Sequence, residues 1–257
     1  DVCSSDLSGA IPRYLSCGFI LEEGLPMETL KAVVTSMAET ARAAGIAIVT
    51  GDTKVVQRGA ADKLFINTAG MGAIPANIHW GAQMLTAGDV LLVSGTLGDH
   101  GATILNLREQ LGLDGELVSD CAVLTPLIQT LRDIPGVKAL RDATRGGVNA
   151  VVHEFAAACG CGIELSEAAL PVKPAVRGVC ELLGLDALNF ANEGKLVIAV
   201  ERNAAEQVLA ALHSHPLGKD AALIGEVVER KGVRLAGLYG VKRTLDLPHA
   251  EPLPRIC

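Results

Sequence analysis

Residues 46–56, IAIVTGDTKVV, form an apolar, β-branched run that leads into Gly51, Asp52 and Thr53. β-branched residues favour strands, and a glycine beside an aspartate is typical of a turn. We therefore expect a buried strand whose end presents Asp52, where a carboxylate can hold Mg²⁺ together with phosphate oxygens. Lys54 would then offset phosphate charge as a point cation. Taken alone, GDTK is more simply explained as a plain β-turn with a surface lysine.

Strands and helices alternate on both sides of this segment. We expect a first domain of residues 1–80, a second domain of residues 81–245, and a tail of residues 246–257. The expected strands lie at 14–21, 62–74, 86–95, 162–166 and the end of 189–200, with a closing hairpin at 220–240. The expected helices lie at 27–45, 101–110, 119–134, 173–184, 202–215 and, after a loop, the second part of 139–160. This mixture indicates α+β or α/β layers.

The composition excludes several classes of protein. The chain has 22 Lys and Arg against 29 Asp and Glu, a formal charge of −7, and no basic run, which disfavours nucleic-acid binding. No apolar stretch approaches the length of a transmembrane helix. Residues 1–15 lack the apolar region of a secretory signal. We therefore expect a cytoplasmic protein that binds neither nucleic acid nor membranes.

The segment DATRGG (142–147) precedes a predicted helix and is suited to an anion. Backbone N–H groups at a helix N-terminus attract negative charge, and glycines let the backbone come close to it. Arg145 can bind phosphate or carboxylate through two hydrogen bonds. The alternative is that Asp142 or Thr144 caps the helix.

Two more polar turns, SGTLGDHG (94–101) and NEG (192–194), lie before a predicted helix and a predicted strand. None of these turns matches a P-loop or a dinucleotide-binding glycine motif. Each is also explained as a solvated turn. Because acidic or glycine-rich turns occur in both expected domains, we favour a composite site between the domains.

The histidines show no metal-binding pattern. His213 and His215 lie two residues apart, so they would not share a helix face. We interpret His100 and His153 as structural or capping residues. Serine–histidine–aspartate catalysis has no GxSxG motif to support it.

One cysteine differs from the others. We interpret five as small buried hydrophobic residues: Cys17, Cys121, Cys159, Cys161 and Cys180. Cys257 instead ends a tail in which Pro248, Pro252 and Pro254 oppose regular structure. An exposed thiol is open to oxidation. A chemical role for Cys257 is therefore favoured over a frayed end.

Six motifs together resemble the HypE family of hydrogenase expression/formation proteins. They are GAIPRYLSCGFILEEG (9–24), GDTKVV (51–56), SGTLGDHG (94–101), RDATRGGV (141–148), ANEG (191–194) and PRIC (254–257). This family of carbamoyl dehydratases belongs to the AIR synthase-related, PurM-like superfamily, with selenophosphate synthetase and thiamine monophosphate kinase. GDTKVV and DATRGG place the chain in the superfamily, and the terminal PRIC is specific to HypE. The resemblance covers residues 8–257.

The resemblance implies an α+β, PurM-like architecture of two domains. An N-terminal α/β domain would join its strands to those of a second subunit, forming a barrel at the centre of a homodimer. A larger C-terminal α+β domain would follow, with ATP bound between the two domains. The C-terminal tail would be mobile.

The resemblance also implies a reaction. A partner carbamoyltransferase, HypF, would place a carbamoyl group on Cys257, and ATP would phosphorylate the carbamoyl oxygen. Loss of phosphate would leave an S-cyano group, whose cyanide goes to the iron of nickel–iron hydrogenase on a HypC–HypD scaffold.

The same resemblance assigns residues to this reaction. The residues it assigns to ATP are Thr53, Lys54, Asp142, Thr144, Arg145 and Gly146, and the one it assigns to Mg²⁺ is Asp52. Asn192 and Glu193 would lie next to the incoming thiocarbamate of Cys257, and Glu193 would take a proton during dehydration.

The first seven residues depart from the family pattern. The family has a further stretch before this point and an Asn-Asp-x-Ala motif just before SGAIP, and Ser4 stands where that aspartate belongs. We therefore expect an N-terminally truncated chain whose ATP-linked dehydration is weak or absent. The alternatives are a non-catalytic scaffold for hydrogenase maturation, or another ATP-dependent kinase or synthetase of the superfamily. The terminal cysteine argues against a kinase or synthetase.

Overall fold

The computed structural model describes residues 6–113, 115 and 117–247. The chain divides between Ile78 and His79 into two compact units, beside the boundary at residue 80 expected from the sequence. Cys257 and the expected tail from Pro248 onward lie outside the described residues.

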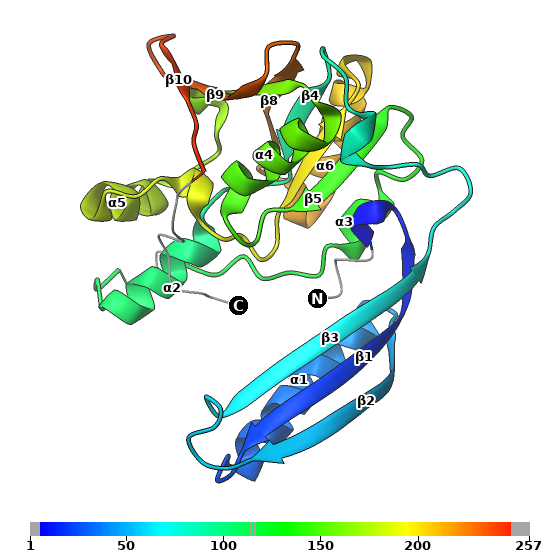
Figure 1. Cartoon of the computed structure of the whole chain (residues 1–257), viewed down its shortest axis with the longest axis vertical. Coiled ribbons are helices and arrows are strands. Elements are labelled where there is room, and N and C mark those ends of the chain that lie inside the picture. Colours follow the sequence, from blue (N-terminus) through cyan, green and yellow to red (C-terminus); the bar gives the residue numbers. More distant parts are fainter. Residues whose placement is uncertain (1–5, 114, 116, 248–257) are drawn as a thin grey trace. The chain divides into compact units, whose positions relative to one another are not determined.

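Unit 1 is a three-stranded sheet with one helix (Figure 1). Its elements are β1 (Ile11–Glu22), α1 (Met27–Ala43), β2 (Ala47–Val56) and β3 (Leu64–Ala73). β1 is the central strand, parallel to β2 and antiparallel to β3. A parallel pair needs a crossover connection, and α1 provides it between β1 and β2. Within the described residues the sheet is open and does not close into a barrel.

Gly51, Asp52 and Thr53 lie inside β2, which contradicts the predicted buried strand ending in a turn. Every residue of β2 except Val56 is exposed or nearly so, because β2 is an edge strand of a narrow sheet. Pairing with β1 continues through all three residues. A Cβ at position 51 would lie only 1.9 Å from the Cys17 carbonyl oxygen, so glycine is required for this close approach.

Unit 2 is built on a seven-stranded sheet of order β10-β9-β6-β8-β4-β7-β5. The strands are β4 (Val90–Val93), β5 (Val137–Asp142), β6 (Gly162–Ser166), β7 (Leu196–Val200), β8 (Ala222–Val228), β9 (Gly232–Ala236) and β10 (Lys242–Thr244). The helices are α2 (Asp99–Glu109), α3 (Thr125–Gln129), α4 (Gly147–Cys159), α5 (Pro174–Leu183) and α6 (Ala205–His213). None of the helices in the described part of the chain has the length and apolar character needed to cross a membrane.

The centre of unit 2 is a dry aliphatic core. Every residue of β4 and β7 is buried, which explains why both strands are continuous apolar runs. Leu91 and Val93 of β4 belong to one cluster with Val152 and Phe155 of α4, which lies along one face of the sheet (Figure 1). This core fixes the ends of β5 and β7, where the polar turns begin.

Three secondary-structure predictions for unit 2 were wrong. The predicted helix at 119–134 is reduced to the five residues of α3, because Pro126 starts a new helical turn there and the apolar spacing continues in non-helical turns. The predicted loop before α4 contains β5. The predicted closing hairpin does not form, since β6 lies between β8 and β9 and pairs with both.

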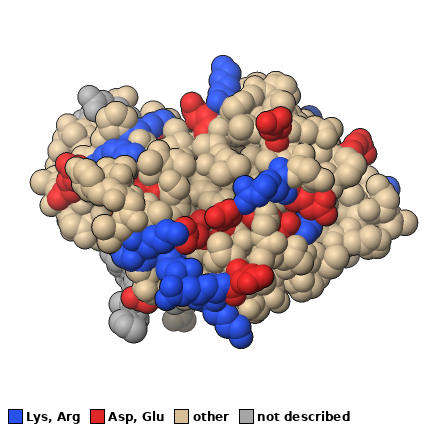
Figure 2. Space-filling model, turned by 90° about the horizontal axis from the view of Figure 1, so that it is seen from above, with Lys and Arg blue, Asp and Glu red and all other residues tan. Residues whose placement is uncertain are grey.

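Charged side chains on the surface are mixed in sign. In the view of Figure 2, Lys and Arg lie beside Asp and Glu. The ion pairs of unit 2 include Arg141–Glu154 at 3.1 Å, Lys242–Glu164 at 2.6 Å and Arg243–Asp186 at 3.0 Å. The positive charges named here are therefore neutralised locally.

Candidate functional site

Two polar turns that are distant in sequence meet in unit 2. β5 and β7 are antiparallel neighbours, with Asp142 opposite Leu196. The turn after β5 therefore lies beside the turn before β7, and the Asn192 N–H donates to the Ala143 carbonyl at 3.0 Å. The structure thus brings the DATRGG and NEG segments together, because the two strands that they adjoin, β5 and β7, pair with each other.

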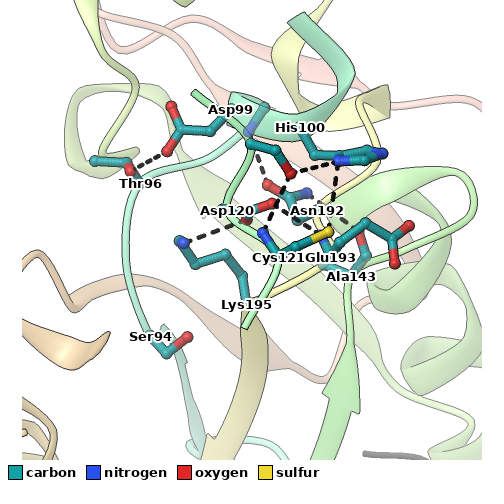
Figure 3. Close-up of polar contacts among 12 residues, drawn as sticks. Ser94, Thr96, Asp99, His100, Asp120, Cys121, Ala143, Asn192, Glu193 and Lys195 are labelled. Carbon is teal, nitrogen blue, oxygen red and sulfur yellow. Dashed lines mark hydrogen bonds and ion pairs between the residues drawn. The ribbon is translucent and has the colours of Figure 1, made fainter. Parts of the chain in front are cut away.

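Asn192 ties three segments together from a fully buried position (Figure 3). Its Oδ1 accepts the Gly98 N–H at 2.8 Å, at the start of α2. Its Nδ2 donates to the carbonyls of Ala143 at 3.1 Å and Phe190 at 2.9 Å. Both amide hydrogens of the side chain are therefore used inside the protein, which gives Asn192 a positioning role for the residue that follows it.

Glu193 is held by its backbone and leaves its carboxylate unused. The Glu193 N–H donates to Asp120 Oδ1 at 3.0 Å, and Asp120 forms an ion pair with Lys195 at 3.2 Å. A Cβ on the next residue, Gly194, would lie 1.8 Å from the Asp120 carbonyl oxygen, so only glycine allows this approach. Glu193 Oε1 is buried and has no hydrogen-bond partner among the described residues.

The surroundings of Glu193 shift its protonation. Burial raises the pKa of the Glu193 carboxyl above its ordinary value. The charge of His100 lowers this pKa, whereas the negative charges of Asp120 and Asp142 raise it further. A carboxylate with a raised pKa is a better proton acceptor at neutral pH than an ordinary surface glutamate. Glu193 therefore has the environment of a general base.

The DATRGG segment does not cap α4 through a side chain. The N-cap of α4 is Gly146, with φ 73°, and no side chain bonds to it, which excludes the capping alternative for Asp142 and Thr144. Thr144 Oγ1 instead donates to Asp142 Oδ2 at 2.8 Å. Arg145 is exposed, and its side chain makes no hydrogen bond or ion pair with another described residue. Its guanidinium is thus available to an anion.

The start of α2 places a histidine near Glu193, which the sequence interpretation missed. His100 is 8% exposed, and its Nδ1 lies 2.8 Å from Ser119 Oγ. Cys121 Sγ lies 3.9 Å from the same nitrogen. The prediction that Cys121 is buried was wrong, because it lies in an irregular loop that no strand or helix covers. Nothing in the spacing of residues 117–124 signals this contact.

A polar cavity of about 320 Å³ adjoins this group. Its charged lining residues are Asp99, Asp120, Lys173, Lys195 and Asp220. Lys173 pairs with Asp99 at 2.9 Å, just as Lys195 pairs with Asp120. Ser119 and Cys121 also line the cavity, so the cavity borders the residues that contact His100.

The predicted metal and phosphate residues of unit 1 lie on the open face of its sheet. Asp52 and Lys54 line a depression of about 460 Å³ with Gly18, Phe65 and Asn67. Strand side chains alternate, so the Thr53 side chain points to the opposite face, and only its N–H reaches Asp52 Oδ1, at 2.7 Å.

Asp52 is not part of a complete metal site. No group of three His, Cys, Asp or Glu residues that would hold a metal occurs in the described ranges. Mg²⁺ commonly takes one or two carboxylates and fills its remaining positions with phosphate oxygens and water. The free carboxylate oxygen of Asp52 and the adjacent Lys54 fit a magnesium–phosphate group on those terms.

Comparison with known proteins gives two family matches. "AIR synthase related protein, N-terminal domain" matches residues 2–74, and "AIR synthase related protein, C-terminal domain" matches residues 86–237. The chain is 99% identical over 251 residues to carbamoyl dehydratase HypE of Escherichia coli (strain K12), covering 98% of this chain and 75% of that protein. It is 49% identical over 254 residues to carbamoyl dehydratase HypE of Cupriavidus necator, covering 98% and 72%.

Solved structures agree with these matches. The crystal structure of E. coli HypE superimposes with a TM-score of 0.98 at 95% identity, covering 100% of this chain and 80% of that one. HypE in complex with ATP gives 0.95 at 44% identity, covering 100% and 78%. A HypE–HypF complex gives 0.93 at 45% identity, covering 96% and 83%. The chain therefore belongs to the AIR synthase related protein family and, within it, to the HypE carbamoyl dehydratases.

Proposed function

We propose that this chain dehydrates an S-carbamoyl group on its own Cys257 to an S-cyano group in an ATP-dependent lyase reaction. The cyanide would supply the ligands of the iron in nickel–iron hydrogenase. The observation that carries this proposal is Glu193, whose buried carboxylate oxygen has no partner among the described residues, in a chain that is 99% identical to a carbamoyl dehydratase.

Glu193 would act as the proton acceptor. Converting R–S–C(=O)–NH₂ to R–S–C≡N removes the oxygen and two N–H protons, and the net loss is one water. ATP, when bound, supplies phosphorylation of the carbamoyl oxygen, which turns a poor leaving group into a good one. Glu193 takes one N–H proton, while Asn192 and Asp120 hold its backbone in place. Burial of the carboxyl favours this role, since it raises the proton affinity.

Each unit carries residues that we assign to the nucleotide. We assign Mg²⁺ to Asp52 and phosphate to Lys54, with Thr53 contributing only its backbone. The residues that we assign to the phosphates in unit 2 are Asp142, Thr144, Arg145 and Gly146. The guanidinium of Arg145, which has no partner among the described residues, and the glycine start of α4 support this assignment. A HypE structure with ATP supports a nucleotide in this family.

Three protein partners belong to this proposal. HypF would donate the carbamoyl group, supported by the HypE–HypF complex of a relative. A HypC–HypD complex would receive the cyanide. A second copy of the chain would cover the apolar sheet of unit 1, where Phe65 is 51% and Met71 65% exposed. The cytoplasmic location remains a prediction.

Intact mass spectrometry tests the proposal. The full chain is incubated with HypF and a carbamoyl donor, with and without Mg-ATP. We expect one carbamoyl adduct on Cys257 that loses the mass of one water only when ATP is present. Cys257→Ser should show neither adduct. Cys180→Ser is the matched control, because Cys180 is a free thiol on α5, outside the Glu193 group, and this variant should leave both steps unchanged.

Other outcomes identify the alternatives. A carbamoyl adduct that persists with Mg-ATP would support the maturation scaffold, or the weak dehydration expected from Ser4. ATP hydrolysis that follows addition of a small phosphate acceptor, with no adduct on Cys257, would support a kinase or synthetase of the superfamily.

A further inference from the structure

We propose that His100 is a positioning residue for Glu193, which sets the protonation of this carboxylate and passes its proton on toward Ser119. This inference rests on the proposed function, because it assigns Glu193 as the proton acceptor. Its place in the SGTLGDHG motif sets His100 apart from His153 and His213 in the sequence.

His100 and Glu193 are carried by one rigid junction. His100 lies in the first turn of α2. That turn is bonded to the segment before Glu193, because the Gly98 N–H donates to Asn192 Oδ1 at 2.8 Å and the Gly101 N–H donates to the Ala191 carbonyl at 3.1 Å. The imidazole and the carboxylate therefore keep a fixed relation.

Both side chains present a buried polar atom that lacks a partner. His100 Nε2 and Glu193 Oε1 are buried, and neither has a hydrogen bond in the described structure. Such atoms are rare in native proteins, since an unpaired buried polar group costs free energy. The charge of His100 also acts on the Glu193 carboxyl more strongly than that of any other side chain. A water molecule or a substrate N–H between them would satisfy both atoms.

The other edge of the imidazole leads to water. His100 Nδ1 lies 2.8 Å from Ser119 Oγ, which also accepts the Cys121 N–H at 3.2 Å. With Nδ1–H and the Cys121 N–H both donating to this oxygen, the Ser119 hydroxyl hydrogen is free to point into the polar cavity that Ser119 lines.

The proton transfers balance along this path. A proton taken from the carbamoyl nitrogen by Glu193 moves to Nε2 of the neutral imidazole. Nδ1–H then gives its proton to Ser119 Oγ, whose own hydroxyl proton passes to cavity water. Glu193 ends as a carboxylate and is ready for the second N–H proton. His100 is neutral again but carries its hydrogen on Nε2, so Nδ1 must regain a proton from the Ser119 hydroxyl, and Nε2 release one, before another relay.

The charged groups around both side chains fix the expected pH effect. Glu193 faces His100, Asp120 and Asp142, and His100 faces Glu193 and the Cys121 thiol. His100 is the largest influence that lowers the pKa of the Glu193 carboxyl. Removing its charge should therefore raise that pKa further.

Carbon-13 NMR of the full chain with labelled glutamate carboxyls tests this directly. The titration midpoint of Glu193, assigned by its loss in Glu193→Gln, should move to higher pH in His100→Gln. It should stay in place in His213→Gln, the matched control, whose imidazole bonds the Ala221 carbonyl and does not act on Glu193. An unchanged midpoint in His100→Gln would overturn the inference.

Ser119→Ala is the second variant, which keeps the imidazole. It should raise the Glu193 midpoint by less than His100→Gln, because the His100 ring loses the Ser119 oxygen beside Nδ1 but remains present. We also measure the rate of single-turnover conversion to the cyano adduct as a function of pH. In both variants, the acid limb of this rate profile should shift to higher pH. If wild type forms the cyano adduct but neither variant shifts the acid limb of the rate profile or the Glu193 titration midpoint, only this inference fails. If wild type itself forms no cyano adduct, the proposed function fails, and the NMR titration still decides the role of His100.

Discussion

The two units of this chain bury their strands in opposite ways. Every residue of β4 and β7 in unit 2 is buried, whereas β2 in unit 1 is exposed along nearly its whole length. Unit 2 completes its own aliphatic core around α4. Unit 1 instead presents apolar side chains such as Val49, 55% exposed, and Phe65, 51% exposed. We infer that unit 2 can fix the geometry of its site with its own core. The exposed apolar side chains of unit 1 need another surface to cover them.

The chemistry follows the same division. Glu193, His100 and Asn192 are fixed by buried hydrogen bonds within unit 2. Asp52 and Lys54 stand on an open sheet face with few protein partners. We infer that unit 2 positions the general base, and that unit 1 offers charged groups whose geometry a ligand completes.

The largest effect is expected at the general base. Glu193→Gln keeps the shape of the side chain but removes its proton-accepting charge. The single-turnover rate of cyano formation should fall by roughly 10²-fold or more. Carbamoylation of Cys257 should be unchanged, since in our proposal HypF performs that step. An equal loss of both steps would show that Glu193 serves folding or partner binding instead.

The rigid turn of unit 2 should tolerate no side chain at position 194. Gly194→Ala would place a Cβ at 1.8 Å from the Asp120 carbonyl and should lower the free energy of unfolding by about 2–3 kcal/mol. Gly178→Ala is the matched control, because Gly178 lies in α5 with nothing within 4 Å. It should stabilise by up to about 1 kcal/mol. Urea unfolding measures both, and similar values for the two variants would contradict the account of the turn.

Self-association should depend on the open sheet of unit 1. Phe65→Asp places a charge on the exposed sheet of unit 1. We expect light scattering after gel filtration to report a dimer for wild type and a monomer for this variant. Leu182→Asp is the control, since Leu182 is 67% exposed on α5. A dimer that survives Phe65→Asp but not Leu182→Asp would place the interface on unit 2.

The smallest effect is a pH-dependent gain in stability. A carboxyl whose pKa is raised on folding stabilises the protein below its unfolded pKa of about 4.3, and this contribution is lost as the pH rises through the folded pKa. Glu193→Gln should therefore match wild type in acid and become increasingly more stable than wild type toward neutral pH. A constant difference in the free energy of unfolding at all pH values would exclude burial of the charged form as the cause.

Much of the fold is predictable from local pattern. The apolar runs at β1, β3, β4 and β6, and the amphipathic spacing of α1 and α5, identify those elements directly. The prediction of a closing hairpin was wrong because β9 pairs with β6, which is distant from it in the sequence. No local sequence signal indicates this pairing. The prediction that β2 is buried was wrong. An apolar sequence does not reveal whether the surface that covers a strand belongs to the same chain.

The site was predictable in part. The motifs identified Glu193 and Asp142, which the β5–β7 pairing brings together. They did not identify Ser119 or Asp120, because these residues lie in an irregular loop whose contacts arise only in the folded chain. His100 lies within the SGTLGDHG motif but was interpreted as a structural residue. The GDT segment was wrongly predicted to form a turn. Its glycine, Gly51, allows β2 to lie close to β1 and does not reverse the direction of the chain.

Infrared spectroscopy of the nitrile bond tests the central claim most directly. The chain is carbamoylated by HypF from a ¹³C-labelled donor and then given Mg-ATP. We predict a new C≡N stretching band that shifts with the isotope, requires ATP, and is absent in Cys257→Ser. A carbamoyl adduct on Cys257 that persists with ATP and gives no nitrile band would contradict the account.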